Sequence, residues 1–74
     1  MLAQIWADVL GMERIALEDD FVDLGGNSLA ALRIIARVYE ATGIKMPVRA
    51  MFDNLTVASM AVRLKELRGT DAGD

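Results

Sequence analysis

Ser28 is the residue whose type and setting most clearly indicate chemistry in this chain. It follows Gly25-Gly26-Asn27 and opens a run of good helix formers. A serine beside glycine is typical of a nucleophile elbow, but Ala30 stands where the second glycine of that motif belongs. The chain has no histidine to act as a base for the serine, and nothing supports a lysine base. Covalent labelling by a fluorophosphonate probe would be needed to support the hypothesis of a serine hydrolase.

The residues before this serine do not form a metal or nucleotide site. Glu18-Asp19-Asp20 with Asp23 lacks the alternating ligands, central glycine and terminal glutamate of an EF-hand loop, so a solvated acidic loop is the better interpretation. The chain has no cysteine or histidine for a zinc site. Gly25-Gly26 lacks the spacing and the lysine of a P-loop. By elimination, the residues favour a protein that is acted upon over one that is itself a catalyst.

Length and charge narrow the class of protein further. The 74 residues fit one small domain. Eight Lys and Arg against eleven Asp and Glu give a formal net charge of −3, which argues against nucleic acid as a partner. No apolar run reaches the roughly 18 residues of a membrane span, and the first four residues lack the basic start of a signal peptide. We expect a soluble, cytoplasmic domain with no membrane partner.

The elements that position Ser28 begin with a helix over residues 2–10. Its apolar residues have the i, i+3, i+4, i+7 spacing of a one-sided helix: Leu2, Ile5, Trp6, Val9 and Leu10. Gly11 ends the pattern, and a long connection over residues 12–27 follows. Five apolar residues can hold this connection against the bundle: Ile15, Leu17, Phe21, Val22 and Leu24. Connections of this length are often functional.

A second helix is predicted from Ser28 to about Thr42, and Gly43 is placed to stop it. On a wheel of roughly 100° per residue, Ile35 gives the core direction. Four residues lie beside it: Ala31, Leu32, Val38 and Tyr39. Three charged residues point away: Arg33, Arg37 and Glu40. Leu29 lies about 120° from the core direction and is predicted to be exposed next to Ser28.

Two further helices complete the predicted fold. A short one follows Pro47, with helical spacing of Val48, Met51 and Phe52, and ends at Asp53-Asn54. Thr56 caps the last helix. Its apolar stripe contains Val57, Met60, Ala61, Leu64 and Leu67. Three main helices and one short helix make an all-α domain over residues 1–68, and residues 69–74 have the composition of a C-terminal linker or tail.

The place of Ser28 at the start of the second helix has two interpretations. Unpaired backbone N–H groups and the positive end of the helix dipole favour an anionic substituent there, such as a phosphate ester. The simpler interpretation is that Ser28 is only an N-cap, the commonest use of serine at this position, which contributes about 1 kcal/mol. Spacing alone favours the N-cap.

The stretch from Asp20 to Leu29, Asp-Phe-Val-Asp-Leu-Gly-Gly-Asn-Ser-Leu, resembles the phosphopantetheine attachment signature of peptidyl carrier domains of nonribosomal peptide synthetases. Residues 5–11 resemble the first helix of that family, and residues 52–57 resemble the start of its last helix. The resemblance implies the four-helix bundle of acyl carriers. It also implies that a phosphopantetheinyl transferase moves 4'-phosphopantetheine from coenzyme A onto Ser28.

The same resemblance implies a carrier that is a cosubstrate rather than an enzyme. The thiol of the arm would hold an aminoacyl, aryl or peptidyl group as a thioester and present it to adenylation, condensation, thioesterase or tailoring domains. A monomeric domain is expected. Partner docking is expected at exposed Leu29 and at Met51 on the short helix. Further docking residues are Gly26, Asn27, Arg33 and Arg49, and weak electrostatic steering is expected from Arg33, Arg37 and Arg49.

Two residues depart from the family pattern. Asn27 stands where His or Asp is more usual, and Leu55 replaces the common proline before Thr56. These departures leave open a carrier of a polyketide, fatty-acid or hybrid pathway, although the double glycine favours a peptidyl carrier. A plain interaction bundle that uses Leu29 and Met51 without any modification is also open.

Overall fold

The structure, a computed structural model, describes residues 1–53 and 55–72, with the backbone alone for residues 69–72. Within this part of the chain there are four helices: α1 (Leu2–Leu10), α2 (Ser28–Thr42), α3 (Val48–Asp53) and α4 (Val57–Ala72). The described residues form no strand, only an isolated antiparallel bridge between Asp20 and Thr56. The predicted all-α fold of three main helices and one short helix is confirmed.

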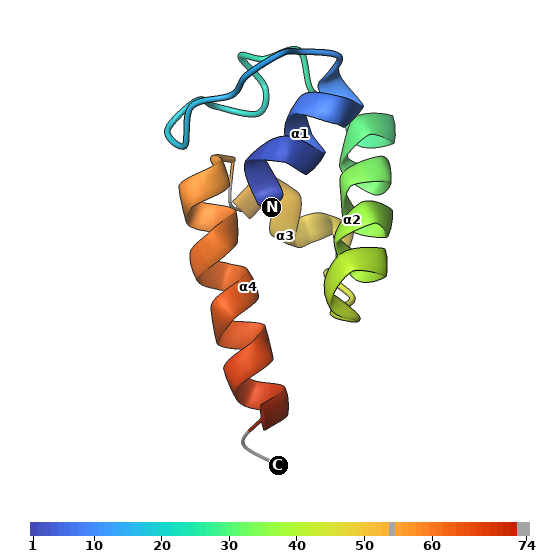
Figure 1. Cartoon of the computed structure of the whole chain (residues 1–74), viewed down its shortest axis with the longest axis vertical. Helices are drawn as coiled ribbons and strands as arrows, with labels where there is room; N and C mark the ends of the chain where they lie inside the picture. The colour runs from blue at the N-terminus through green and yellow to red at the C-terminus, as the bar shows by residue number, and fades with distance from the viewer. Residues whose placement is uncertain (54, 73–74) are drawn as a thin grey trace.

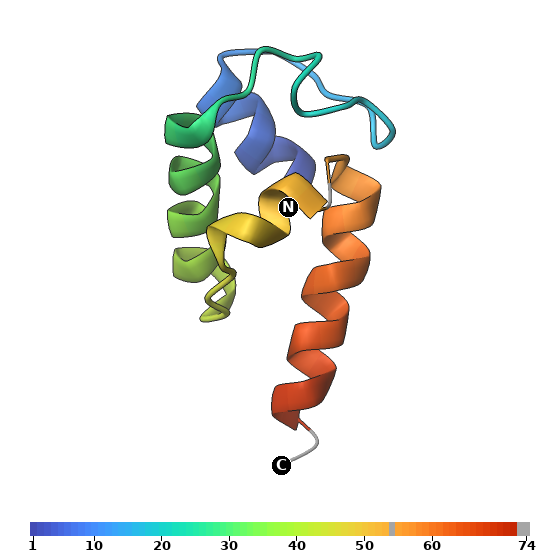
Figure 2. The ribbon, with the colours of Figure 1, turned by 180° about the vertical axis from the view of Figure 1, so that it is seen from behind.

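The helices stand around one core. Figure 1 shows α2 and α4 on opposite sides of the molecule with α1 and α3 between them, and Figure 2 shows the same arrangement from behind. The connection from α1 to α2 crosses the end of the molecule at which both α2 and α4 begin. Packed helix pairs include α1 with α2, α1 with α4, and α2 with α3. Ser28 therefore lies at the end that carries the connection.

The core of the described residues is hydrophobic, with methionines beside aliphatic and aromatic side chains. Its largest fully buried side chains are Trp6, Phe21, Ile34, Met46, Met51, Met60, Val38 and Val57. The indole Nε1–H of Trp6 donates to the Met60 sulfur at 3.2 Å. Among the described residues no polar or charged side chain is buried. Hydrophobic packing thus holds the bundle, as expected for a domain without disulfides.

The long connection is attached to the start of α4 by backbone hydrogen bonds. The N–H of Ala58 donates to the carbonyl of Leu17 at 3.0 Å, and the N–H of Phe21 donates to the carbonyl of Leu55. Of its five apolar residues only Ile15 and Phe21 are buried, whereas Leu17 and Val22 are exposed. The prediction that the connection is held against the bundle is confirmed, but by fewer side chains than expected.

The helix ends agree well with the predicted ones. Gly11 and Gly43 follow α1 and α2 with φ of 71° and 75°. Thr56 caps α4, because its Oγ1 accepts from the N–H of Ser59 at 3.1 Å. The backbone of α4 continues to Ala72, beyond the predicted apolar stripe, so the residue 68/69 boundary stays a prediction. The predicted stop at Asn54 and the last two residues of the predicted tail lie outside the described residues.

The predicted core direction of α2 is wrong. Its buried residues are Ala31, Ile34 and Val38, whereas Leu32 is 50% exposed and Tyr39 is also exposed. The wheel was centred on Ile35, which is only partly buried. Because α2 carries apolar residues on two faces, its hydrophobic pattern alone does not identify the inner one. On α4, Ala61 is likewise exposed rather than part of the buried stripe.

Candidate functional site

Ser28 is the first residue of α2 and is exposed, with Asn27 before it as the N-cap. Asn27 has extended backbone angles (φ −146°, ψ −176°), and its side chain accepts a hydrogen bond from the N–H of Ala30 at 2.9 Å. The interpretation of Ser28 as an N-cap is therefore wrong, because Asn27 performs that role. The Ser28 hydroxyl has no hydrogen-bond partner among the described residues. It is available for modification.

The start of α2 also suits a negatively charged substituent. The carbonyl of Asn27 accepts from the N–H of Ala31 at 2.9 Å, and the Asn27 side chain satisfies Ala30. In the described part of the chain the N–H groups of Ser28 and Leu29 have no protein partner. The first turn of α2 contains no acidic residue. A phosphodiester on Ser28 would therefore meet unpaired donors and the positive end of the helix dipole, worth about 0.3–1 kcal/mol.

The turn that delivers the chain to Ser28 is built by Asp20. Its carboxylate Oδ1 accepts from the N–H groups of Val22 and Asp23 at 2.9 and 3.2 Å, and its carbonyl accepts from Leu24 at 3.0 Å. The sequence predicts Asp20 only as part of a solvated acidic loop, so this structural role is an addition from the structure. Asp followed closely by a double glycine is the signal that could have found it, because Asp side chains commonly hydrogen-bond the backbone two or three residues on.

Glycine is needed at positions 25 and 26 for two different structural reasons. Gly25 has a φ of +89°, in the left-handed region that residues with a Cβ rarely adopt. A Cβ on Gly26 would lie only 2.5 Å from ring atoms of Phe21. Glycine is thus required at position 26 because the Phe21 ring occupies the space of a side chain there, independently of any role of Gly26 in docking.

Exposed apolar side chains lie on α2 next to Ser28 and on the outer side of α3. Leu29 is 59% exposed, as predicted, and Leu32 lies one turn further on the same helix. On α3, Val48 and Phe52 are exposed. Met51 is 0% exposed, so the prediction that it presents a docking contact is wrong. Met51 and Ala50 form the inner face of α3. The neighbouring residues Val48 and Phe52 face outward instead.

The charged residues predicted to steer partners are all on the surface. Arg33 and Arg49 are exposed on α2 and α3. Arg37 lies 4.0 Å from the carboxylate of Asp8 on α1, with both side chains about half exposed. Such an exposed pair contributes little to stability. The exposed arginines can therefore contribute to encounter with an acidic partner.

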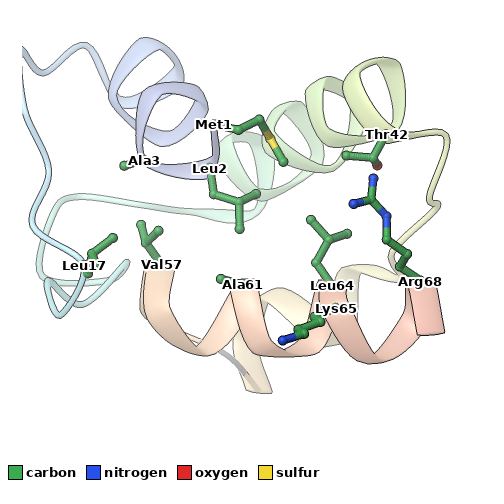
Figure 3. Close-up of a pocket in the computed structure, with 10 residues that line it drawn as sticks. All are labelled: Met1, Leu2, Ala3, Leu17, Thr42, Val57, Ala61, Leu64, Lys65 and Arg68. Carbon is green, nitrogen blue, oxygen red and sulfur yellow. The ribbon is translucent and has the colours of Figure 1, made fainter. Parts of the chain in front are cut away.

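No catalytic apparatus accompanies Ser28 in the described structure. A cavity of about 570 Å³ lies between α1 and α4 and reaches Thr42, at the opposite end of α2. Figure 3 shows Leu2, Val57 and Leu64 projecting into this space. The 15 residues of α2 span about 22 Å, so this cavity is remote from the serine. The described residues contain no cluster of three metal-ligating side chains, and none of their helices is long and apolar enough to cross a membrane.

Fold and site together define a small helical carrier domain: a four-helix bundle that exposes one serine at the start of its second helix. Comparison with known proteins gives the family. The family model described as "Phosphopantetheine attachment site" matches residues 2–64. The chain belongs to this family of carrier domains.

Relatives of known function are peptide synthetases. Tyrocidine synthase 3 of Brevibacillus parabrevis is 41% identical over 70 residues, which is 95% of this chain but 1% of that protein. BlmI, a type-II acyl carrier protein of Streptomyces verticillus involved in bleomycin biosynthesis, superposes with a TM-score of 0.85 at 35% identity, covering 88% of this chain and 78% of BlmI.

A second solved structure contains a carrier together with an enzyme. It is described as the phosphopantetheine transferase Sfp in complex with coenzyme A and a peptidyl carrier protein. Its matching chain has a TM-score of 0.84 at 31% identity, over 88% of this chain and 84% of that one.

Proposed function

We propose that this chain is a peptidyl carrier domain that bears 4'-phosphopantetheine on Ser28. The observation that carries the proposal is the exposed Ser28 hydroxyl, left without a hydrogen bond because Asn27 takes over the cap. The unpaired N–H groups behind it suit the phosphodiester that would result. Bound there, the arm supplies a terminal thiol that holds cargo as a thioester.

Attachment is a transfer of a phosphoryl group from coenzyme A. The Ser28 Oγ attacks the phosphorus that carries the pantetheine arm, and a new O–P bond forms. The bond from that phosphorus to the adenosine bisphosphate half breaks, and this half leaves. The hydroxyl proton goes to a base of the transferase, since this chain has no histidine to accept it. The domain is therefore a substrate of the transferase and not an enzyme.

The cargo and partners follow from the family. The proposed cargo is an aminoacyl, aryl or peptidyl group, and the proposed partners are a phosphopantetheinyl transferase and adenylation, condensation, thioesterase or tailoring domains. The transferase in complex with a similar carrier supports the first of these. A monomeric, cytoplasmic domain over residues 1–68 is part of the proposal. Docking would use Leu29 and Leu32 with Asn27, Gly26, Arg33 and Arg49 around them.

The test is loading with coenzyme A and a transferase of broad specificity, followed by intact mass. We expect one arm on the wild-type chain and none on Ser28→Ala. Ser59 is the only other serine and is exposed, so Ser59→Ala is a matched control that should load normally. Loading of Ser28→Ala, or an unmodified wild type beside a loaded reference carrier, would overturn the proposal.

A carrier of a polyketide or hybrid pathway is the second candidate. Asn27, in place of the more usual His or Asp, is the observation that favours it, because this residue lies directly beside the attachment serine. Transfer assays on the loaded domain distinguish the two. Transfer of cargo to condensation domains supports the peptidyl carrier, and efficient transfer only to ketosynthases supports the alternative.

A further inference from the structure

The Phe21 ring leaves no room for a side chain at position 26. A Cβ built on Gly26 would lie 2.5 Å from Cε1 and Cζ of the Phe21 ring and 2.6 Å from Cε2. Carbon atoms in contact normally lie about 3.5–4.0 Å apart. The ring thus occupies the space of any side chain at position 26. The N–H of Gly26 also donates to the carbonyl of Phe21 at 2.9 Å, so both ring and backbone of Phe21 hold this glycine.

The Phe21 ring is itself fixed from the other sides. It is 0% exposed and packs edge-to-face against Trp6, with centroids 5.4 Å apart at 73°, and against Phe52 at 6.3 Å and 77°. The N–H of Phe21 is bonded to the carbonyl of Leu55, just before α4. Because protein interiors are closely packed, these contacts resist a displacement of the Phe21 ring. A group forced between ring and glycine would therefore move the glycine.

Gly26 is only two residues from the reacting hydroxyl. Between them stands Asn27, extended and locked by its cap to Ala30. A displacement of Gly26 would therefore reach Ser28 through a single intervening residue. We propose that Phe21 is a positioning residue for loading: its ring sets where the Gly26 backbone lies and hence where the Ser28 hydroxyl meets the transferase. This inference rests on the proposed function of Ser28.

The experiment is a compensating pair of substitutions. Gly26→Ala places a methyl group against Cε1, Cζ and Cε2 of Phe21. Phe21→Leu removes these three atoms, because a leucine side chain ends at Cδ. We expect Gly26→Ala to lower kcat of loading by about 10- to 100-fold, as misplacement of a reacting group does, and to change KM less than kcat because Leu29 stays exposed. Adding Phe21→Leu should restore kcat to within about threefold of Phe21→Leu alone, a non-additive result.

A control separates positioning from stability. Val38 is fully buried on α2 and lies twelve residues from Gly26, so Val38→Ala destabilises the fold by another route. Measured where it is folded, it should load with wild-type kcat. The inference fails if Gly26→Ala loads like wild type, or if the double variant has a kcat no higher than Gly26→Ala. Should Gly26→Ala not fold, the double variant decides: a kcat far below that of Phe21→Leu refutes the inference. Absence of loading in wild type would instead refute the proposed function.

Discussion

Exchanging Asn27 for alanine separates the capping residue from the acceptor residue at the start of α2. The substitution removes the 2.9 Å hydrogen bond from the N–H of Ala30, leaving this donor unpaired beside those of Ser28 and Leu29. Because Asn27 is exposed, water replaces part of the bond, and the loss should be about 1 kcal/mol of unfolding free energy. For a domain of this size that corresponds to a fall in Tm of roughly 4–8 °C.

The two neighbouring positions should respond in opposite ways. Ser28→Ala removes a hydroxyl without a partner, so its unfolding free energy should stay within about 0.5 kcal/mol of wild type while loading is abolished. Asn27→Ala should still be loaded, and Asn27→Asp should recover the cap and gain from the helix dipole. Urea unfolding and intact mass on the same four proteins measure both quantities. Equal destabilisation by Asn27→Ala and Ser28→Ala would refute the assignment of the cap.

Substitutions at three other positions test the surroundings of the site. Met51→Ala should cost about 2–5 kcal/mol in urea unfolding, because Met51 is fully buried; a cost below 1 kcal/mol would contradict its place in the core. Leu29→Ala should leave stability within about 0.5 kcal/mol and raise KM for partner enzymes up to about tenfold, and unchanged KM values would remove Leu29 from the docking surface. Gly25→Ala should cost about 1–2 kcal/mol in thermal unfolding through its φ of +89° alone, since nothing lies within 4 Å of the new methyl group; Gly25→Asn should cost less, and equal costs would point to another cause.

The sequence predicted features with a local signal. Periodicity and the glycines at 11 and 43 predicted α1 and α2 to within a residue, and Thr56 predicted the start of α4. The motif around Ser28 pointed to the attachment site. Burial was harder to predict where a helix is short: α3 has six residues, less than two turns, so periodicity did not show that Met51 faces inward.

Long-range contacts had no local signal at all. That Phe21 packs under Gly26 and between Trp6 and Phe52 depends on how the connection crosses the bundle, which no spacing rule encodes. Asn27 and Ser28 are hard to tell apart as caps for a different reason: both residue types are good N-caps, and the backbone angles decide between them.

The inner face of α2 was predicted wrongly because its outer face also carries apolar residues. Leu29 and Leu32 are 59% and 50% exposed and lie three residues apart, so they form one apolar strip beside Ser28. Covering the exposed half of one leucine yields about 1 kcal/mol, and covering both yields about 2 kcal/mol. That is roughly a 30-fold gain in affinity, enough to orient a partner over the serine and too little to retain it. Such a weak surface suits the proposed carrier, which each partner enzyme would have to release in turn, whereas Asp20, Phe21 and Asn27 fix the backbone beside the serine. The contacts that stabilise the site therefore lie in the turn before Ser28, and the weakly attractive apolar surface lies on the exposed side of α2. Because α2 carries apolar residues on both its buried and its exposed faces, the hydrophobic pattern does not identify the core direction.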